Sequence, residues 1–455
     1  MPTDQAAVCL DVGSTWTKAV LVRPDGGLAG FAEHPTTATD VLTGMDAAVR
    51  AVSAAGSGAE PELFACSSAG GGMRLAVVGA EMLMATEAGH RVACSAGAHV
   101  VHVHAGPLQH ADLRTLRTTR PTVLLLLGGY DGDDPADLLH NAGRLAGARV
   151  RFPIVLAAPE AVRDDALAVL RATGRTVVTC ENVLPQRGQI VAEPARAALA
   201  ALYRRHAVGG RGPAVGPRFR RLVRVATPEA VGHGAVELAR IRGGRVLVVD
   251  VGCATTDVHS AADGAGVRTV EGDLGVRAAA GGVLVGAQAE GVVDPVEADL
   301  LTPTVARMTS EVGYVPGDPG SAAEDRRVAA LAAVVAVRRH LRAQAAEREV
   351  DLVVLSGGVF RRRDPWGGLA AVSSTLRSDP ELAPALADAP VVIDTDFAVA
   401  PAGLLAANGR AEAAESLLRD HLLGEVGPGC QRGDTADTQR LQCHPAATTA
   451  RPELP

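Results

Sequence analysis

Two short segments of the chain place acidic, glycine and hydroxyl residues in the same order. Residues 11–18 read Asp-Val-Gly-Ser-Thr-Trp-Thr-Lys, and residues 250–257 read Asp-Val-Gly-Cys-Ala-Thr-Thr-Asp. Each segment lies between apolar runs that predict strands, so each predicts a turn between two strands. Backbone N–H groups that line such a turn can form a nest for an anion. Residues 11–18 therefore predict a phosphate-binding turn, and residues 250–257 repeat its form.

Lys18 closes the first segment and is the only lysine among 455 residues, because the other members of the 44 Lys and Arg are all arginine. An ammonium group is a compact, mobile point charge, whereas a guanidinium group is a planar fork. A polyphosphate held in a tight turn is better neutralised by the ammonium. We therefore expect Lys18 to contact a phosphate group, and a surface lysine retained by chance is the alternative.

The elements around the first turn predict a β-meander followed by a helix at about residues 41–52. An Asp-Gly-Gly sequence at residues 25–27 favours a tight turn between two of the strands. A run of glycines at residues 70–72 permits a close backbone approach or a sharp chain reversal. The expected strands are Val8–Asp11, Ala19–Arg23, Leu28–His34 and Leu63–Ser67.

Residues 80–200 alternate short apolar runs with helical stretches, which is typical of a parallel α/β layer. The turn Gly128–Asp134 follows one strand, at the strand end where open α/β sheets place ligands. A solvated turn is the alternative for its carboxylates, Asp131, Asp133 and Asp134. The expected strands are Val100–Val103, Val123–Leu127, Ile154–Ala157 and Thr176–Val178, and the expected helices are 136–146 and 160–173.

Beyond a Gly-, Pro- and Arg-rich stretch at residues 209–221, the pattern of a strand, an Asp-x-Gly turn and a return strand repeats. A strand at Val246–Val249 enters the second turn, a return strand leaves it, and a strand at Asp351–Leu355 runs into Gly357-Gly358. Helices are expected at 323–347, 401–407 and 411–423, with a strand at 391–395. The polar, Pro- and Gly-containing end of the chain predicts a disordered tail.

The two Asp-x-Gly turns, with the later strand that ends in Gly357-Gly358, resemble the ATPase core shared by actin, Hsp70 chaperones and sugar and acetate kinases. The resemblance implies an α/β fold: a two-lobed actin/Hsp70-like (ribonuclease H-like) ATPase core with an inserted α/β subdomain and a disordered C-terminal tail. The implied boundaries are 1–80 for the first lobe, 81–208 for the inserted segment, 209–226 for a linker, 227–423 for the second lobe and 424–455 for the tail.

The same resemblance implies a role for each candidate residue in a site for ATP and Mg²⁺. Asp11 and Asp250 would hold Mg²⁺ through water, because Mg²⁺ sheds its hydration shell reluctantly. Lys18 and Asp257 complete the implied catalytic set. The residues that would bind the nucleotide are Gly13, Ser14 and Thr15 of the first turn, Gly252, Thr255 and Thr256 of the second turn, and Gly357 and Gly358 of the adenosine motif.

Longer motifs resemble one family within that superfamily, the glutamate mutase L family of MutL/GlmL-type accessory proteins. This resemblance implies a weak ATPase that is not itself a mutase but maintains or reactivates an adenosylcobalamin-dependent mutase. Glutamate (methylaspartate) mutase subunits would be its partners. The motifs run in order along residues 7–423 and are 67–74, 139–142, 193–196, 249–260 and 270–277.

The chain departs from the family's expected pattern at two residues. Cys253 stands where a second glycine is expected in the second turn, and it would be strained if that position needed a positive φ. Tyr130 stands where a smaller residue is expected.

Two other functions fit the same fold. A small-molecule kinase would need a general base, for which Asp257 or Asp131 could serve. A nucleotide-binding module without hydrolysis would result if Cys253 disabled the second turn.

The composition argues against several other classes. The formal net charge of −7 disfavours broad nucleic-acid binding, and the aromatic content of 2% disfavours base stacking and predicts a core of Val, Leu and Ala. Seven scattered cysteines without a Cys-x-x-Cys pair fit a reduced, cytoplasmic protein. The first residues do not resemble a signal peptide, and no apolar stretch approaches the length of a membrane span.

Two patterns that contain histidine resemble ligand-binding sites, but we expect neither to bind its ligand. His99, His102 and His104 resemble a metal cluster, but no Cys or carboxylate accompanies them in sequence, so we expect structural histidines. Asp257-Val258-His259 resembles the opening of a B12-binding motif, but Ala262 replaces the glycine that the motif requires. We therefore expect that the chain does not bind cobalamin itself.

Overall fold

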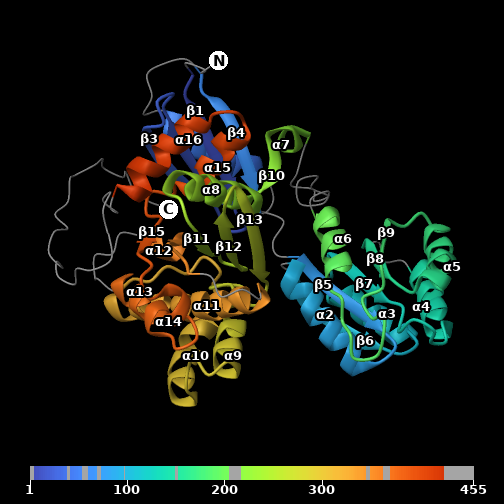
Figure 1. Ribbon diagram of the computed structural model, residues 1–455. Coiled ribbons are helices and arrows are strands. Elements are labelled where there is room, and N and C mark those ends of the chain that lie inside the picture. The colour runs from blue at the N-terminus through green and yellow to red at the C-terminus, as the bar shows by residue number, and fades with distance from the viewer. Residues whose placement is uncertain are drawn as a thin grey trace, which may run out of the picture.

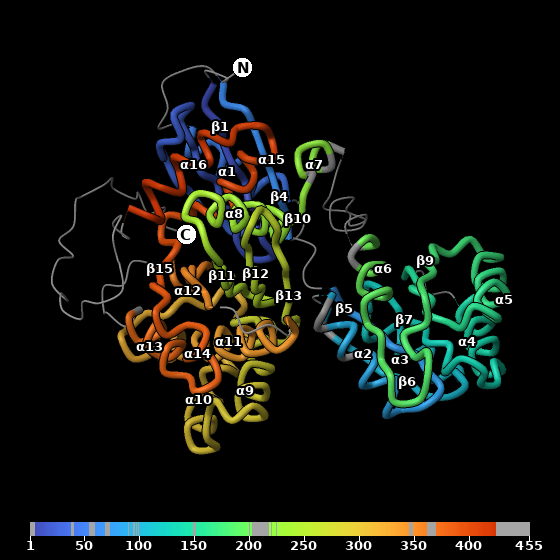
Figure 2. Tube along the Cα trace, viewed as in Figure 1, coloured from blue at the N-terminus to red at the C-terminus, as the bar shows by residue number. Residues whose placement is uncertain are grey.

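The structure of the chain is a computed structural model that describes residues 5–37, 41–53, 60–68, 73–96, 98–148, 152–203, 217–344, 349–361 and 369–424. The glycine run 70–72, the linker up to residue 216 and the predicted tail from residue 425 lie outside these ranges, as does the side chain of His99. Figures 1 and 2 show a body of two stacked lobes with a separate α/β unit beside it.

The first sheet carries the first of the two turns. Its strand order is β10-β4-β1-β2-β3. β1, β2 and β3 form the predicted antiparallel meander, while β4 runs parallel to β1, and β10 runs parallel to β4. The bounds are Ala7–Val12 for β1, Trp16–Val22 for β2, Leu28–Pro35 for β3, Glu62–Ser67 for β4 and Val223–Ala226 for β10.

The second sheet repeats the first strand for strand. Its order, β13-β12-β11-β14-β15, matches that of the first sheet taken from its other edge, β3-β2-β1-β4-β10. Here β11, β12 and β13 form the antiparallel meander, and β14 and β15 continue in parallel. Because the order and the strand directions are the same, the two lobes share one plan, and the predicted two-lobed α/β fold is confirmed. The bounds are Val246–Val251 for β11, Thr256–Ala262 for β12, Ala265–Glu271 for β13, Leu352–Ser356 for β14 and Val391–Ile393 for β15.

Helices cover both sheets and join them. The helices of the two lobes are α1 (Val41–Ser53), α7 (Pro217–Leu222), α8 (Thr227–Arg242), α9 (Ala280–Ala289), α10 (Pro295–Ser310), α11 (Pro319–Ala343), α12 (Gly358–Arg361), α13 (Leu369–Ser378), α14 (Ala383–Leu386), α15 (Val399–Ala407), α16 (Ala411–Leu418) and the π-helical turn η2 (Arg419–Leu423).

Helices α8 and α15 cross between the two sheets with their backbones in direct contact (Figure 1). A Cβ atom on Gly403 would lie 1.8 Å from the Ala230 carbonyl oxygen, and one on Gly234 would lie 2.1 Å from the Val399 carbonyl oxygen. Only glycine fits at either position, because real Cβ atoms do not approach backbone so closely. Each helix follows the last strand of one sheet, so this crossing is the junction of the lobes.

The core is built mainly from Val, Leu and Ala, as the low aromatic content predicts. One buried cluster lies between the sheets and includes Cys9 of β1, Leu238 of α8, Val248 of β11 and Leu405 of α15. Side chains from both lobes therefore pack into one hydrophobic cluster around the crossing helices. Within the ranges given above, no helix is long and apolar enough to cross a membrane.

The third sheet belongs to the unit beside the two lobes and is entirely parallel, in the order β6-β5-β7-β8-β9. This agrees with the predicted α/β layer. The bounds are β5 (Met73–Gly79), β6 (Ala98–Ala105), β7 (Val123–Leu127), β8 (Ile154–Ala157), β9 (Val177–Cys180), α2 (Met82–Ala96), α3 (His110–Thr118), α4 (Ala136–Gly147), α5 (Glu160–Arg171) and α6 (Glu193–Tyr203).

The strand pairing bears on where this unit begins and ends. β5 starts ahead of the expected boundary at residue 81 and pairs with β6 and β7 of the third sheet. β10 lies inside the expected linker 209–226 and pairs with β4 of the first sheet. We therefore propose that the inserted unit spans residues 73–203.

Candidate functional site

The first turn is held by hydrogen bonds from its own ends and from β3. The Gly13 N–H donates to the Trp16 carbonyl at 3.1 Å, and a Cβ on Gly13 would lie 2.6 Å from that oxygen. Thr36, which follows β3, donates its hydroxyl to the Gly13 carbonyl and its N–H to the Thr15 carbonyl, both at 2.8 Å. The turn that contains the predicted phosphate ligands is thus fixed by the fold itself.

The second turn joins β11 to β12 with the same closing bond, from the Gly252 N–H to the Thr255 carbonyl at 2.9 Å. The N–H groups of Val276 and Arg277 donate to the Gly252 and Cys253 carbonyls at 3.0 and 2.9 Å. The segment that follows β13 therefore lies directly behind this turn and supports it.

Cys253 stands where the first turn has Ser14, because both turns have the same length between paired strands. Among the described residues other than glycine, a positive φ occurs at Arg120, Asp263 and Phe397. Cys253 is not among them, so its backbone does not carry the strain that a positive φ would cause.

The strand register makes the ends of the two hairpins equivalent. Asp11 is the cross-strand partner of Lys18, and Asp250 is the cross-strand partner of Asp257. Cross-strand partners share one face of a sheet. The first hairpin therefore sets an ammonium group beside its aspartate, and the second sets a carboxylate there.

Asp11 is buried, with 2% of its surface exposed, and accepts three hydrogen bonds. The Lys18 ammonium donates at 2.9 Å, the Thr227 hydroxyl at 2.5 Å and the Cys66 thiol at 3.8 Å. Burial raises the pKa of the Cys66 thiol well above its ordinary value, and the Asp11 carboxylate adds to that effect, so the thiol stays a neutral donor. Thr227 begins α8, so it ties the first turn to the junction of the lobes.

Asp250 experiences the charges of both turns. Withdrawal from solvent is the main cause that raises the pKa of Asp250 to about 7. The Lys18 ammonium opposes this rise, while the carboxylates of Asp257, Asp11 and Asp394 add to it. Carboxylates thus outnumber the ammonium here, and hard oxygen ligands with excess negative charge suit a divalent cation such as Mg²⁺.

The side chains of Asp257 and Thr256 are engaged by the protein's own groups. Asp257 contacts the Arg268 guanidinium at 2.5 Å and accepts from the Thr255 hydroxyl at 3.1 Å. The Thr256 hydroxyl donates to the Leu274 carbonyl at 2.7 Å. The hydroxyl proton of Thr256 is therefore already used within the protein.

The Gly357-Gly358 pair lies where β14 meets the second turn. Gly357 has a φ of 127°, and a Cβ there would lie 2.2 Å from the Val251 carbonyl oxygen. The preceding residue, Ser356, donates its hydroxyl to Asp394 at 3.2 Å. Asp394 in turn accepts from the Ala398 N–H at 2.6 Å and so caps the start of α15. The Gly357-Gly358 pair is thereby linked to the helix at the junction of the lobes.

A cluster of aromatic and charged side chains bridges the lobes beside Lys18. The Lys18 ammonium lies 5.0 Å from the ring centre of Phe397, and the Arg361 guanidinium lies 4.9 Å from it. The Phe31 ring of β3 meets the Phe397 ring edge to face at 6.4 Å, and Arg361 reaches Glu33 of β3 at 3.8 Å. No local sequence pattern indicates these neighbours of Lys18. The low number of Phe residues, 6 in the chain, is the one signal that could have drawn attention to them.

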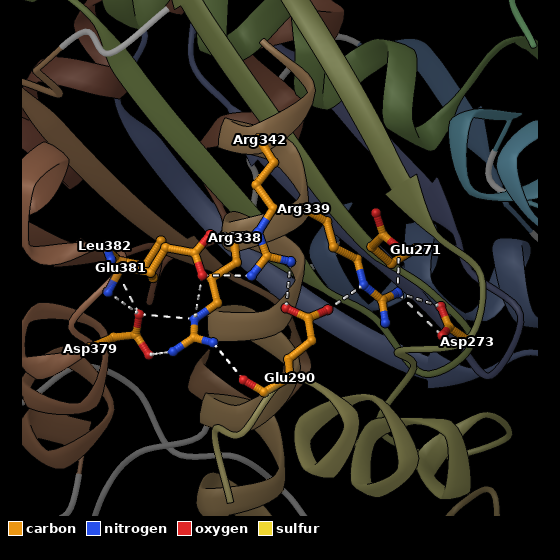
Figure 3. A network of polar contacts seen from close by, with 9 residues as sticks. All are labelled: Glu271, Asp273, Glu290, Arg338, Arg339, Arg342, Asp379, Glu381 and Leu382. Atoms are coloured by element: carbon orange, nitrogen blue, oxygen red, sulfur yellow. Dashed lines mark hydrogen bonds and ion pairs between the residues drawn. The ribbon is translucent and has the colours of Figure 1, made fainter. Parts of the chain in front are cut away.

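Arginines of α11 hold the segment behind the second turn (Figure 3). The Arg339 guanidinium contacts Glu271 at 2.7 Å and Asp273 at 3.2 Å. Glu290, just after α9, contacts Arg339 at 2.8 Å and Arg342 at 3.0 Å. Burial raises the pKa of Glu271 to about 7, although Arg339 opposes the rise. The support of the second turn therefore depends on a network of ion pairs.

The network continues through Arg338 to the far side of α11 (Figure 3). Arg338 contacts Asp379 at 2.6 Å, and both side chains are more than nine-tenths buried. Glu381 lies 3.6 Å from Arg338 and 2.5 Å from Arg342. These contacts fix α11 to the segment between α13 and α14.

The turn Gly128–Asp134 in the inserted unit borders a small hollow. Its carboxylates have local partners: Asp131 accepts from Asn182 at 2.8 Å, Asp133 lies 3.6 Å from Arg187, and Asp134 accepts from the Ala136 N–H at 3.0 Å. These contacts fit the solvated-turn interpretation. The hollow is lined by Gly79, Ala80, Glu81, Met84, Ala85, Leu127, Gly129, Tyr130, Asp133 and Leu184.

The described histidines that resemble functional motifs lie in strands, partly or fully withdrawn from solvent. His104 of β6 lies 3.7 Å from Asp112, and desolvation lowers the pKa of His102. The described part of the chain contains no group of three His, Cys, Asp or Glu residues that could hold a metal ion. His259 is buried in β12 against Gly232, and desolvation lowers its pKa well below the ordinary value.

Several solved structures resemble the chain at low identity. An ATP-dependent caprolactamase from Pseudomonas jessenii is 16% identical with a TM-score of 0.37, over 90% of this chain and 70% of that chain. A xylulose kinase from Lactobacillus acidophilus is 11% identical with a TM-score of 0.35, over 92% of each chain. Component A of (R)-2-hydroxyglutaryl-CoA dehydratase from Acidaminococcus fermentans is 10% identical with a TM-score of 0.28, over 90% of this chain and 96% of that chain.

Sequence comparison is more specific. Protein MutL of Clostridium tetanomorphum is 34% identical over 294 residues, which are 59% of this chain and 64% of that protein. The match therefore spans less than two thirds of that relative's length. The family described as MutL protein matches residues 7–422. Because that match covers nearly all of both lobes and the inserted unit, the chain belongs to the MutL family, as its sequence motifs indicate.

Proposed function

We propose that the chain binds Mg-ATP between its two lobes and uses it to maintain or reactivate an adenosylcobalamin-dependent mutase, such as glutamate (methylaspartate) mutase. Membership of the MutL family supports the kind of partner. The observation that carries the nucleotide site is the convergence of two equivalent turns at the junction of the lobes, with Lys18 and Asp11 on one and Asp250 on the other.

The backbone of each turn would face one side of the phosphate chain. N–H groups in a tight turn bind anions, and glycine lets the ligand approach closely. Gly358 would admit the nucleoside beside β14, because it carries no side chain, and Gly357 would allow β14 its close approach to the Val251 carbonyl. Ser14 and Thr15 of the first turn and Thr255 and Thr256 of the second would offer the anion-binding N–H groups. Gly13 and Gly252 would instead close the turns, because their N–H groups donate to the Trp16 and Thr255 carbonyls.

Asp11 and Asp250 would hold Mg²⁺, which neutralises phosphate charge when bound. Lys18 pairs with Asp11 at 2.9 Å, so its ammonium would exchange that carboxylate for a phosphate oxygen as the cation takes Asp11. Asp257 would position the second turn through its contacts with Arg268 and Thr255. Lobe movement about the α8–α15 crossing would then carry the nucleotide state to the partner.

The alternatives gain no support from these contacts. A kinase would use Asp257 or Asp131 as a base, but Asp257 is paired with Arg268, and Asp131 accepts from Asn182. A turn disabled by Cys253 would require strain that is absent from its backbone.

Reactivation of a purified mutase tests the proposal. A glutamate mutase inactivated by turnover is incubated with the chain, Mg-ATP and fresh adenosylcobalamin, and recovered activity is followed over time. We expect faster recovery than without the chain or without ATP. The Lys18→Ala variant should lose the effect, whereas Arg23→Lys, an exposed change, should keep it. Recovery that is equally fast with and without the chain would contradict the proposal.

A further inference from the structure

Helices α9 and α10 expose apolar side chains at the end of the second lobe. Val285 of α9 exposes 68% of its surface, and Val296 and Leu300 of α10 expose 70% and 72%. Residues four apart lie on one face of a helix, so Val296 and Leu300 point the same way. Figures 1 and 2 show α9 and α10 side by side, extending away from both sheets. Large apolar side chains left exposed on two neighbouring helices indicate an interaction surface.

The same region carries carboxylates and no basic side chain of its own. Residues 280–306 contain no Lys, Arg or His, but contain Glu290, Asp294, Glu297 and Asp299. Glu290 is matched by Arg339 and Arg342, and Glu297 by Arg327. Asp299 lies exposed between Val296 and Leu300 in the chain. Asp294 is exposed as well, so a complementary surface carries apolar side chains with Lys or Arg placed to meet Asp294 and Asp299.

Helix α9 is also fixed to the support of the second turn. A Cβ on Gly282 would lie 2.0 Å from the Asp273 carbonyl oxygen, so helix and segment are in backbone contact. Arg339 joins Asp273 to Glu290 at the other end of α9 (Figure 3). A Cβ on Gly275 would lie 2.2 Å from Ala254 of the turn. A displacement of the turn by a phosphate group would therefore move α9.

We propose that the α9–α10 face, defined by Val285, Val296 and Leu300, docks the partner mutase through an apolar segment of that enzyme flanked by basic residues. The identity of the partner rests on the proposed function. A second copy of this chain suits the face less well, because it would bring acidic residues against acidic residues. The link through Asp273 makes the docking affinity depend on the nucleotide held by the second turn.

Charge-introducing variants test the face. Leu300→Glu and Val296→Glu place a good helix former on an exposed helix and should leave the circular dichroism spectrum unchanged. Val267→Glu is the matched control, since Val267 of β13 is also exposed, by 53%. Binding of purified glutamate mutase to the full chain is measured by titration calorimetry with and without Mg-ATP. We expect Leu300→Glu and Val296→Glu to weaken binding about tenfold or more, and Val267→Glu to leave it unchanged.

A second probe decides the face if the mutase does not bind. It is a synthetic helical peptide of Leu and Lys, with Leu along one face, measured by fluorescence anisotropy at physiological salt. We expect the unmodified chain and Val267→Glu to bind it, and Leu300→Glu and Val296→Glu to bind it about tenfold more weakly.

The outcomes separate the two proposals. If the mutase does not bind the unmodified chain, the proposed partner is wrong, and the peptide alone decides the face. If the mutase binds all variants equally, the α9–α10 face is not its docking site, although the mutase remains the partner. When the mutase does not bind, the proposal that this face is a docking surface fails if the peptide does not bind either, or if it binds all variants equally. Self-association of the unmodified chain that Leu300→Glu abolishes in sedimentation would assign the face to a second copy and overturn the proposal.

Discussion

Lys18 and Asp257 occupy equivalent positions in two hairpins of the same length. Each is the cross-strand partner of the aspartate that precedes its turn, Asp11 for Lys18 and Asp250 for Asp257. Lys18 pairs with Asp11, whereas Asp257 pairs with Arg268 of β13. The duplicated sheets thus differ in charge at one matched position, and this difference gives the first turn an ammonium group.

Replacing Lys18 by Arg should impair the proposed nucleotide site. The ammonium is confined by Asp11 at 2.9 Å and by the Phe397 ring at 5.0 Å, and a guanidinium group is larger and planar. We expect Lys18→Arg to weaken Mg-ATP binding about tenfold, or about 1.4 kcal/mol, in titration calorimetry. The exposed change Arg23→Lys should have no effect. Unchanged binding by Lys18→Arg would mean that the sole lysine has no special role.

The pKa of Asp250 predicts that cation binding depends on pH. A cation requires the carboxylate form, and a pKa of about 7 makes that form scarce at pH 6 and dominant at pH 8. We expect the Mg²⁺ affinity of the chain to rise up to about tenfold between these values, measured by titration calorimetry at constant ionic strength. Asp250→Asn should remove the pH dependence, and a steep rise that persists in this variant would exclude Asp250 as its source.

Asp250 also affects folding stability in a defined direction. Its pKa of about 7 in the folded chain exceeds the ordinary aspartate value of about 3.9, so the folded state binds this proton more tightly. The contribution of Asp250 to the free energy of unfolding should therefore fall as the pH rises from about 4 through 7. Urea unfolding across this range should show a smaller decline for Asp250→Asn than for the unmodified chain.

The crossing of α8 and α15 should not tolerate a side chain. A methyl group on Gly403 would lie 1.8 Å from the Ala230 carbonyl oxygen, so the helices must separate to admit it. We expect Gly403→Ala to lower the free energy of unfolding by about 1–3 kcal/mol in urea denaturation. Gly143→Ala is the matched control, because this glycine of α4 has open space around its Cβ position and should be neutral or slightly stabilising. Equal effects at both positions would refute the packing argument.

The arginines of α11 should differ in their importance for stability. Arg338 and Asp379 are 9% and 6% exposed, so Arg338→Gln leaves a buried carboxylate without its cation. We expect a loss of about 3–5 kcal/mol in the free energy of unfolding, measured by urea denaturation. Arg342 is 48% exposed, and Arg342→Gln should cost no more than about 1 kcal/mol. A larger loss from Arg342→Gln than from Arg338→Gln would show that burial does not govern this network.

Local sequence signals predicted the strands better than the helices. The meander strands are apolar runs with turn residues between them, so their positions follow from short-range pattern. The long helix expected at 323–347 occupies Pro319–Ala343. Helix α9 was not predicted, because its glycines lower helix propensity. Gly282 and Gly286 are tolerated there because they let α9 pack closely on Asp273 and Arg339.

The amino-acid sequence by itself determined the two turns, their equal length, the sole lysine and the family, because each depends on residues that are close in sequence or on motifs read in order. Only the tertiary structure decided which groups surround Lys18 and Asp11. Thr227 is 216 positions from Asp11, and Phe397 comes from the far end of the chain. Such contacts arise when the two sheets close around α8 and α15, and no local pattern encodes them.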